Sequence, residues 1–160
     1  MIEAQEIQKH YGSRAALDGV SFRIEPGEVV GFLGLNGAGK TTMLKVLCGL
    51  LLPSAGRIQV FDVDGVEDPL ALRKNIGFLP DRAPLYGEMT VRDMLTYAGK
   101  LNGVVSGRIA ARVDEVLALA SLQHVADDLI ETLSHGYRQR VGIAQAIVHE
   151  PRLVVLDEPI

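Results

Sequence analysis

The chain is 160 residues long and 48% hydrophobic, which is enough for one sizeable core, or for one core with a small appendage. Its formal net charge is -4 and its basic residues form no run, which argues against direct binding of nucleic acid. The polar, acidic start at Met1–Glu6 predicts no signal peptide, and the apolar stretch Val46–Leu52 is far shorter than the roughly 20 residues of a membrane span.

The first part of the chain predicts an antiparallel β layer. Residues 2 to 10 and 20 to 24 carry short, partly alternating apolar patterns. Pro26 and Gly27 predict a turn before an apolar strand over Val29–Leu33. Tyr11 falls in a predicted turn over Lys9–Gly12, where its ring could stack on a purine. Taken alone, Tyr11 is no more than an ordinary surface tyrosine.

The stretch Gly34–Thr42 (GLNGAGKTT) fits the pattern G-x-x-x-x-G-K-[ST] at every position. A strand-like run precedes it and a helix-like run, Met43–Cys48, follows it, as this motif requires. Its glycines let backbone N–H groups approach a polyphosphate, and the helix that begins near Lys40 adds its positive end. Lys40 can then reach the β and γ phosphates, and the Thr41 hydroxyl can bind Mg²⁺. The motif predicts a nucleoside triphosphate held chiefly by its phosphates.

Further short elements follow the phosphate-loop helix. Cys48, the single cysteine, lies in an apolar helical stripe, so we expect it to pack in the core of a protein in a reducing, cytosolic setting. Gly56–Phe61 alternates as a strand, and Pro69–Lys74 fits a short helix. Ile76–Leu79 is typical of a buried strand. Asp81 follows that strand at its carboxyl end, where open α/β sheets present ligand-binding groups.

The middle of the chain predicts a helical insertion packed on the sheet domain. Val91–Leu101 and Arg108–Ala120 have helical periodicity, and Thr90–Asp93 is typical of a helix start. The residues expected on the apolar faces are Met94, Leu95, Val113, Val116, Leu117 and Leu119.

The last part of the chain again carries candidate functional residues. Leu133–Tyr137 (LSHGY) introduces a predicted helix over Arg138–Val148 with a serine cap. Leu153–Leu156 is typical of a buried parallel strand, and it delivers Asp157 and Glu158 at its carboxyl end. We expect Asp157 to hold Mg²⁺, directly or through water, and Glu158 to orient and partly deprotonate an attacking water.

In this order and spacing, the motifs resemble the ATP-binding subunits of ABC transporters, and the resemblance covers the whole chain. The elements that match are Tyr11 as the adenine-stacking aromatic, Gly34–Thr42 as Walker A, Asp81 at the Q-loop, Leu133–Tyr137 as the signature, and Val154–Pro159 as Walker B with the catalytic glutamate. Within the family, bacterial export-type systems look most similar.

The resemblance implies an α/β fold, a P-loop NTPase core with an N-terminal antiparallel β layer and a helical insertion. It divides the chain into a first part of the ATP-binding core at 1–88, a helical subdomain at 89–132, and the signature helix with the Walker B strand at 133–160. It also implies a cytoplasmic ATPase, peripheral at the inner face of the cell membrane. Such a subunit forms a head-to-tail homodimer, or pairs with another ATPase subunit, around MgATP and drives a transmembrane permease.

Roles for individual residues follow from the same resemblance. Catalysis is assigned to Lys40 and Glu158. The Mg²⁺ ligands are assigned to Thr41, Asp157 and Asp81. The residues expected to bind the nucleotide are Tyr11, Gly34, Leu35, Asn36, Gly37, Ala38, Gly39, Lys40, Thr41, Thr42, Ser134 and Gly136.

Four positions depart from the commonest family pattern. Leu35 replaces a frequent proline, which affects loop stiffness more than chemistry. His135 and Tyr137 replace glycine and glutamine of the signature. Asp81 stands where a glutamine is usual. Because its carboxylate is shorter and charged, we expect Asp81 to reach Mg²⁺ through a water.

Family members continue beyond Walker B with a D-loop, another strand and a histidine that contacts the γ-phosphate, whereas this chain stops at Ile160. We therefore expect a fragment of a longer protein that lacks the C-terminal part of the sheet domain; a naturally shortened cassette is the alternative. A sheet without its later strands exposes an apolar edge, so we expect residues 1–160 alone to self-associate and to hydrolyse ATP poorly.

Other classes fit less well. A soluble ABC-type ATPase of DNA repair or translation usually adds a coiled-coil insertion or a second cassette. A regulatory module that binds nucleotide without turnover stays open. A GTPase would carry an Asn-Lys-x-Asp pattern, and a small-molecule kinase would not explain Leu133–Tyr137.

Overall fold

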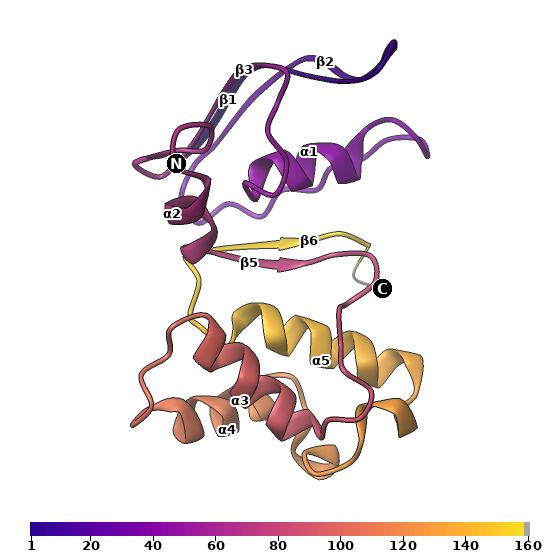
Figure 1. Ribbon diagram of the computed structural model, residues 1–160, viewed down its shortest axis with the longest axis vertical. Helices are drawn as coiled ribbons and strands as arrows, with labels where there is room; N and C mark the ends of the chain where they lie inside the picture. Colours follow the sequence, from indigo (N-terminus) through magenta and orange to yellow (C-terminus); the bar gives the residue numbers. More distant parts are fainter. Residues whose placement is uncertain (159–160) are drawn as a thin grey trace. The chain divides into compact units, whose positions relative to one another are not determined.

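The computed structural model describes residues 1–158 and forms two compact units, which divide between Lys74 and Asn75 (Figure 1). The first unit contains β1 (Ile2–Tyr11), β2 (Arg14–Ile24), α1 (Lys40–Leu47), β3 (Ala55–Val60), β4 (Val63–Asp64) and α2 (Pro69–Lys74). The second contains β5 (Ile76–Leu79), α3 (Val91–Leu101), α4 (Ile109–Leu119), the 3-10 helices η1 (Gln123–Val125) and η2 (Ile130–Thr132), α5 (His135–Ile147) and β6 (Leu153–Leu156). None of the helices among residues 1–158 is long and apolar enough to cross a membrane.

The first unit contains an antiparallel sheet with the strand order β2-β1-β3-β4. The sequence predicts the antiparallel layer but not this order, in which β3 and β4, from beyond the phosphate loop, complete the sheet. The central strand β1 pairs Ile2 with Ile24 of β2 and with Val60 of β3. The helix α1 packs against β2 and β3. Cys48, directly after α1, is 1% exposed, and burial raises the pKa of its thiol to about 12, so it is a core residue as expected.

The strand predicted over Val29–Leu33 is not formed. The segment is irregular, and the side chains of Val29 and Leu33 are 101% and 97% exposed. A strand gains stability only from ladder partners and from burial, and this run has no ladder partner among residues 1–158. Phe32 makes its anchoring contact instead, edge-on to Phe22 of β2 at 5.3 Å between ring centroids. An apolar run alone therefore does not specify a strand.

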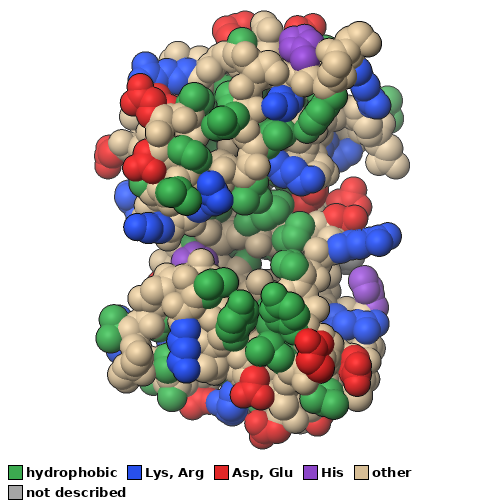
Figure 2. Space-filling view, in the orientation of Figure 1, with side chains coloured by type: hydrophobic (Ala, Val, Ile, Leu, Met, Phe, Trp, Pro, Cys, Tyr) green, Lys and Arg blue, Asp and Glu red, His purple; other side chains and the backbone are tan. Residues whose placement is uncertain are grey.

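A parallel pair, β5 and β6, forms the sheet of the second unit, with Ile76 opposite Leu153 and Leu79 opposite Leu156. A buried parallel strand was predicted over Leu153–Leu156; the strand is formed and is parallel, but the prediction that it is buried is wrong. Only Val155 is buried, while Val154 and Leu156 are 43% and 37% exposed, because two strands cannot cover each other's faces. Hydrophobic side chains are visible between charged ones on the molecular surface (Figure 2).

The helix α5 lies against β5 at very short range, and glycines make this possible. A Cβ on Gly77 of β5 would collide with the carbonyl oxygen of Ala146. On the helix, a Cβ on Gly142 would lie 2.7 Å from Leu79 Cδ1 and 2.8 Å from Ala83 Cβ. The backbones therefore approach more closely than any larger residue allows.

The helical part of the second unit matches the predicted helices over 91–101 and 108–120 to within one residue at each end. Thr90 caps α3, since its Oγ1 accepts a hydrogen bond of 3.1 Å from the N–H of Asp93. The predicted apolar residues are buried, with the exception of Leu119, which is 65% exposed. Leu119 is two residues beyond the buried Leu117 and three beyond the buried Val116, so it lies at the edge of the apolar stripe, at the last residue of the helix.

Replacing Gly77 by alanine should lower the free energy of unfolding by about 1–3 kcal/mol, because the new methyl group must push α5 away from β5. Urea unfolding followed by circular dichroism measures the change. Gly107→Ala is the matched control, since nothing lies within 4 Å of its Cβ position, and it should leave stability within about 0.5 kcal/mol. Equal stability of the two variants would contradict the close packing described above.

Candidate functional site

The predicted phosphate loop lies in the first unit and ends where α1 begins. Gly39, immediately before the helix, has a φ of 91°, and Gly37 has a φ of 82°. A Cβ on Gly39 would collide with the carbonyl oxygen of Ala16 and would lie 3.0 Å from Leu17 Cδ2. Glycine is required at position 39 both for its left-handed backbone and for the close approach of β2.

Lys40 is the first residue of α1, and its ammonium group lies over the loop. Its Nζ donates to the carbonyl oxygens of Gly34 at 2.8 Å and Leu35 at 3.1 Å. Met43 is the first residue of α1 whose backbone N–H has a helical acceptor, the carbonyl oxygen of Gly39. No side chain caps this end of the helix. The amides of residues 40–42 therefore have no helical acceptor and suit an anion. The Thr41 side chain is exposed beside them.

Tyr11 is the last residue of β1, not part of the turn predicted over Lys9–Gly12. It pairs with Arg14 across the hairpin, is 52% exposed, and has Lys9 Nζ at 5.6 Å from its ring centroid. Arg14 is a residue that sequence reasoning missed. Its Nη2 lies 3.8 Å from the Cβ position of Gly37, so the hairpin brings a guanidinium beside the phosphate loop.

The predicted signature lies in the second unit at the start of α5. The helix begins at His135, three residues earlier than predicted, because Ser134 is its N-cap and its Oγ accepts from the N–H of Tyr137 at 3.5 Å. Nothing lies within 4 Å of the Cβ position of Gly136, so this glycine leaves the first turn bare to an approaching group.

Tyr137, which replaces the usual glutamine, is held by two neighbours. Its hydroxyl lies 2.9 Å from His124 Nε2 of η1, and the two rings meet edge-on at 5.5 Å. The Arg140 guanidinium lies 5.6 Å from the centroid of the Tyr137 ring. This side chain therefore ties the first turn of α5 to the helical part of the same unit.

Asp157 follows β6 and is only 4% exposed. Its N–H donates to Leu79 O at 2.9 Å, which continues the ladder between β5 and β6 beyond the strand. Its Oδ2 is buried and has no hydrogen-bond partner within residues 1–158. Because an unpaired buried carboxylate oxygen is costly, this atom suits a cation such as Mg²⁺.

Glu158 has a φ of 50°, a left-handed backbone that is uncommon for a residue other than glycine. Its carbonyl oxygen accepts a hydrogen bond of 3.2 Å from Gln139 Nε2, so α5 supports the turn that carries this acid. Such strain is often stored at functional sites. Sequence reasoning missed Gln139. Pro159, the last residue of the predicted Walker B motif, lies outside the described residues.

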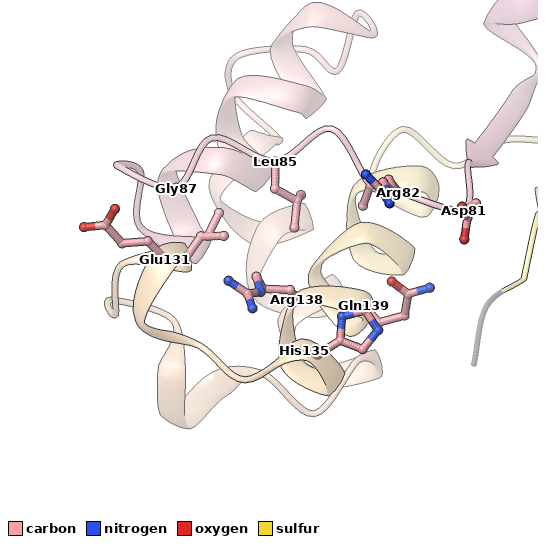
Figure 3. Close-up of a pocket in the computed structure, with 10 residues that line it drawn as sticks. Asp81, Arg82, Leu85, Gly87, Glu131, His135, Arg138 and Gln139 are labelled. Atoms are coloured by element: carbon pink, nitrogen blue, oxygen red, sulfur yellow. The ribbon is translucent and has the colours of Figure 1, made fainter.

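Asp81 lines a cavity of about 380 Å³ within the second unit (Figure 3). The loop that follows β5 supplies Asp81, Arg82 and Leu85, and α5 supplies His135, Arg138 and Gln139. The cavity thus joins the predicted Q-loop to the first turns of the signature helix, which the sequence did not predict. Within residues 1–158, no three acidic, histidine or cysteine side chains gather as a metal site.

Comparison with known proteins agrees with these motifs. The family model described as "ABC transporter" matches residues 17–160. The chain is 35% identical to the bacitracin transport ATP-binding protein of Bacillus licheniformis over 99% of its own length and 51% of that protein. It is 36% identical to Nod factor export ATP-binding protein I of Paraburkholderia xenovorans (strain LB400), over 99% of its length and 52% of that protein. The chain thus spans about half the length of these curated relatives.

A solved structure extends the likeness to three dimensions. The dimeric, post-hydrolysis state of an ATP-binding cassette bound to ADP and Pi superposes with a TM-score of 0.88 and 26% sequence identity. The match covers 99% of this chain and 74% of that one. The predicted fold class, a P-loop core with an antiparallel β layer and a helical insertion, is therefore confirmed. The chain belongs to the ABC transporter family and has the fold of its ATP-binding cassettes.

Proposed function

We propose that the chain is the ATP-binding portion of an ABC transporter subunit, which binds and hydrolyses MgATP at a head-to-tail dimer interface and so drives transport by a membrane partner. The observation that carries this proposal is the start of α1, where Lys40 lies 2.8 Å from Gly34 O beside amides that have no helical acceptor. This arrangement offers a positive charge and several donors to one polyphosphate.

The residues of Gly34–Thr42 would surround the β and γ phosphates of ATP. Backbone N–H groups would donate to phosphate oxygens, and the Lys40 ammonium would exchange its bonds with loop carbonyls for bonds with phosphate. Tyr11 would stack on the adenine, and Arg14 would add positive charge beside Gly37. Each of these groups lies in the first unit, which therefore supplies most of the predicted contacts with one nucleotide.

Asp157, Thr41 and Asp81 would hold Mg²⁺. The ion, when bound, would neutralise the negative charge that develops on the phosphates. The buried Oδ2 of Asp157 fits this role because it has no other partner in the described chain, and the exposed Thr41 hydroxyl is free to act as a neutral oxygen ligand. Asp81 would act through a water molecule.

Glu158 would take a proton from the attacking water and hold that water in line with the γ-phosphate. Ser134 and Gly136 of a second subunit would contact the same phosphate from the other side. The 13-residue helix α5 would add its positive end at that point. The dimeric state of the related cassette bound to ADP and Pi supports a dimer of this kind, with a second copy or a paired ATPase subunit.

The partner in transport would be a transmembrane permease, with the chain in the cytoplasm at the inner face of the cell membrane. The helical subdomain at 89–132 would transmit movement to this permease, and the loop of Asp81 would connect it to the nucleotide. We infer export as the direction, since a relative is named for the export of Nod factor.

Lys40→Ala should weaken MgATP binding by at least about 30-fold, because bonds between an ammonium and phosphate oxygens are lost. Isothermal titration calorimetry of the full-length protein measures this. Lys45→Ala is the matched control, since Lys45 is an exposed lysine in the last turn of the same helix. Equal affinity of the Lys40 variant and the wild type would refute the nucleotide site.

Glu158→Gln should lower kcat for ATP by about 100-fold or more and retain ATP binding, because an amide cannot accept the proton of water. The variant should also accumulate as an ATP-bound dimer on size-exclusion chromatography. Glu67→Gln, at an exposed position of the first unit, should behave as the wild type. A wild-type protein that binds ATP without turnover would instead indicate a regulatory module.

Asp81→Ala should raise the Mg²⁺ concentration for half-maximal ATPase activity by about fivefold, since a water-mediated carboxylate contact is lost. Asp81→Gln, which restores the commoner family residue, should recover most of the activity. Asp62→Ala serves as the control at an exposed acid of the first unit. If the Mg²⁺ dependence of Asp81→Ala matched that of the control, Asp81 would have no part in ion binding.

A further inference from the structure

The short link between α5 and β6 joins the two groups of residues that the second unit contributes to the proposed reaction. The helix α5 begins at His135, directly after its N-cap Ser134, and ends at Ile147; β6 begins at Leu153 and leads to Asp157 and Glu158. The last carbonyl groups of a helix have no partners within it. The last turn of α5 contains no basic residue that could bond to them.

Arg112 of α4 supplies side-chain donors from another helix to two of these carbonyl groups, and one of them, Ile147 O, also accepts the backbone N–H of Glu150 at 3.1 Å. Its Nη2 donates to Ile147 O at 2.8 Å and its Nε donates to Val148 O at 3.0 Å. The side chain is only 10% exposed, so water screens these contacts little. A guanidinium is suited to this position because its planar fork offers several donors in a fixed geometry and its charge favours a helix C-terminus.

Two acids fix the direction of this fork. Arg112 Nη1 lies 2.8 Å from Glu115 Oε2, one turn along α4, and 3.7 Å from Glu150 Oε1 in the link itself. Glu150 also lies 3.5 Å from Arg108 Nη2, but the Arg108 side chain is 71% exposed. Arg112 is thus the buried member of the group and Arg108 is the solvated one.

The other side of the link is fixed to β5. The N–H groups of Arg152 and Leu153 both donate to Asn75 O, at 2.9 and 3.1 Å. His149 Nε2 donates to Ile76 O at 3.3 Å. These bonds set the register of β6 on β5, and the register determines where the strand ends. A displacement of the α5 end would therefore be passed along β6 to its carboxyl end.

We propose that Arg112 is a positioning residue for ATP hydrolysis: by holding the carbonyl groups of Ile147 and Val148, it fixes the end of the signature helix relative to β6 and thereby places Asp157 and Glu158. This inference rests on the proposed function. Arg112 acts through the backbone, and it connects the helical part of the second unit to the acids of the Walker B strand.

The first test compares Arg112→Lys with Arg108→Lys in the full-length protein. Lysine keeps the charge at position 112 but cannot present two donors in a fork, so kcat for ATP should fall about tenfold. KM for ATP should stay within about twofold, because the phosphate loop is untouched. Arg108→Lys should retain kcat. An unchanged kcat in Arg112→Lys, or a change in KM alone, would overturn the proposal.

Hydrogen exchange supplies a second readout that needs no turnover. In Arg112→Lys, the amides of Leu153 and Asp157 should exchange about tenfold faster than in the wild type, and those of β1 should be unchanged. Equal acceleration in β1 would mean general destabilisation and would overturn the positioning role, as would unchanged exchange in β6. If the wild type lacked ATPase activity but Arg112→Lys still showed the local acceleration, the proposed function would fail and the placement of β6 by Arg112 would stand.

Discussion

The close contact between α5 and β5 is the constraint on which the second unit depends. It exists because Gly77 and Gly142 carry no side chains where the helix meets the strand. The same helix presents Ser134 and Gly136 at its start, supports the Glu158 turn through Gln139, and leads through a short link to β6, which Asp157 follows. A single packed helix therefore fixes the spacing between the uncovered first turn at Gly136 and the two acids after β6.

Elements whose signals are local could be predicted from the sequence. The helices α3 and α4 follow from apolar periodicity, since each buries one stripe against its neighbours. The phosphate loop could be recognised from its glycines, since the loop needs a positive φ at Gly37 and Gly39 and few other residues tolerate that backbone. The start of α5 was predicted three residues too late. Ser134 was recognised as the cap, but residues 135–137, which form the first turn after it, were not assigned to the helix.

Features that depend on distant partners could not be predicted. An apolar run such as Val29–Leu33 becomes a strand only beside other strands, and its composition does not name them. The exposure of Val154 and Leu156 likewise depends on neighbours of β6. Arg14, Gln139 and Arg112 are ordinary surface types in the sequence, and their roles arise from contacts with residues 19 to 36 positions away or across a hairpin. Only the folded chain reveals which polar residue meets which backbone group.

The starts of α3, α1 and α5 show how N-capping differs between a structural helix and a helix that we propose binds phosphate. Thr90 satisfies the first turn of α3 with a hydrogen bond of 3.1 Å, which is useful where the helix is purely structural. Gly39 has no side-chain oxygen to cap α1, so no side chain competes with a phosphate for the first-turn amides. Ser134 lies between these cases, since its 3.5 Å contact with the Tyr137 N–H is long. A hydroxyl held this weakly stabilises the helix modestly and can still turn toward an anion, so the caps become weaker where ligand binding is proposed.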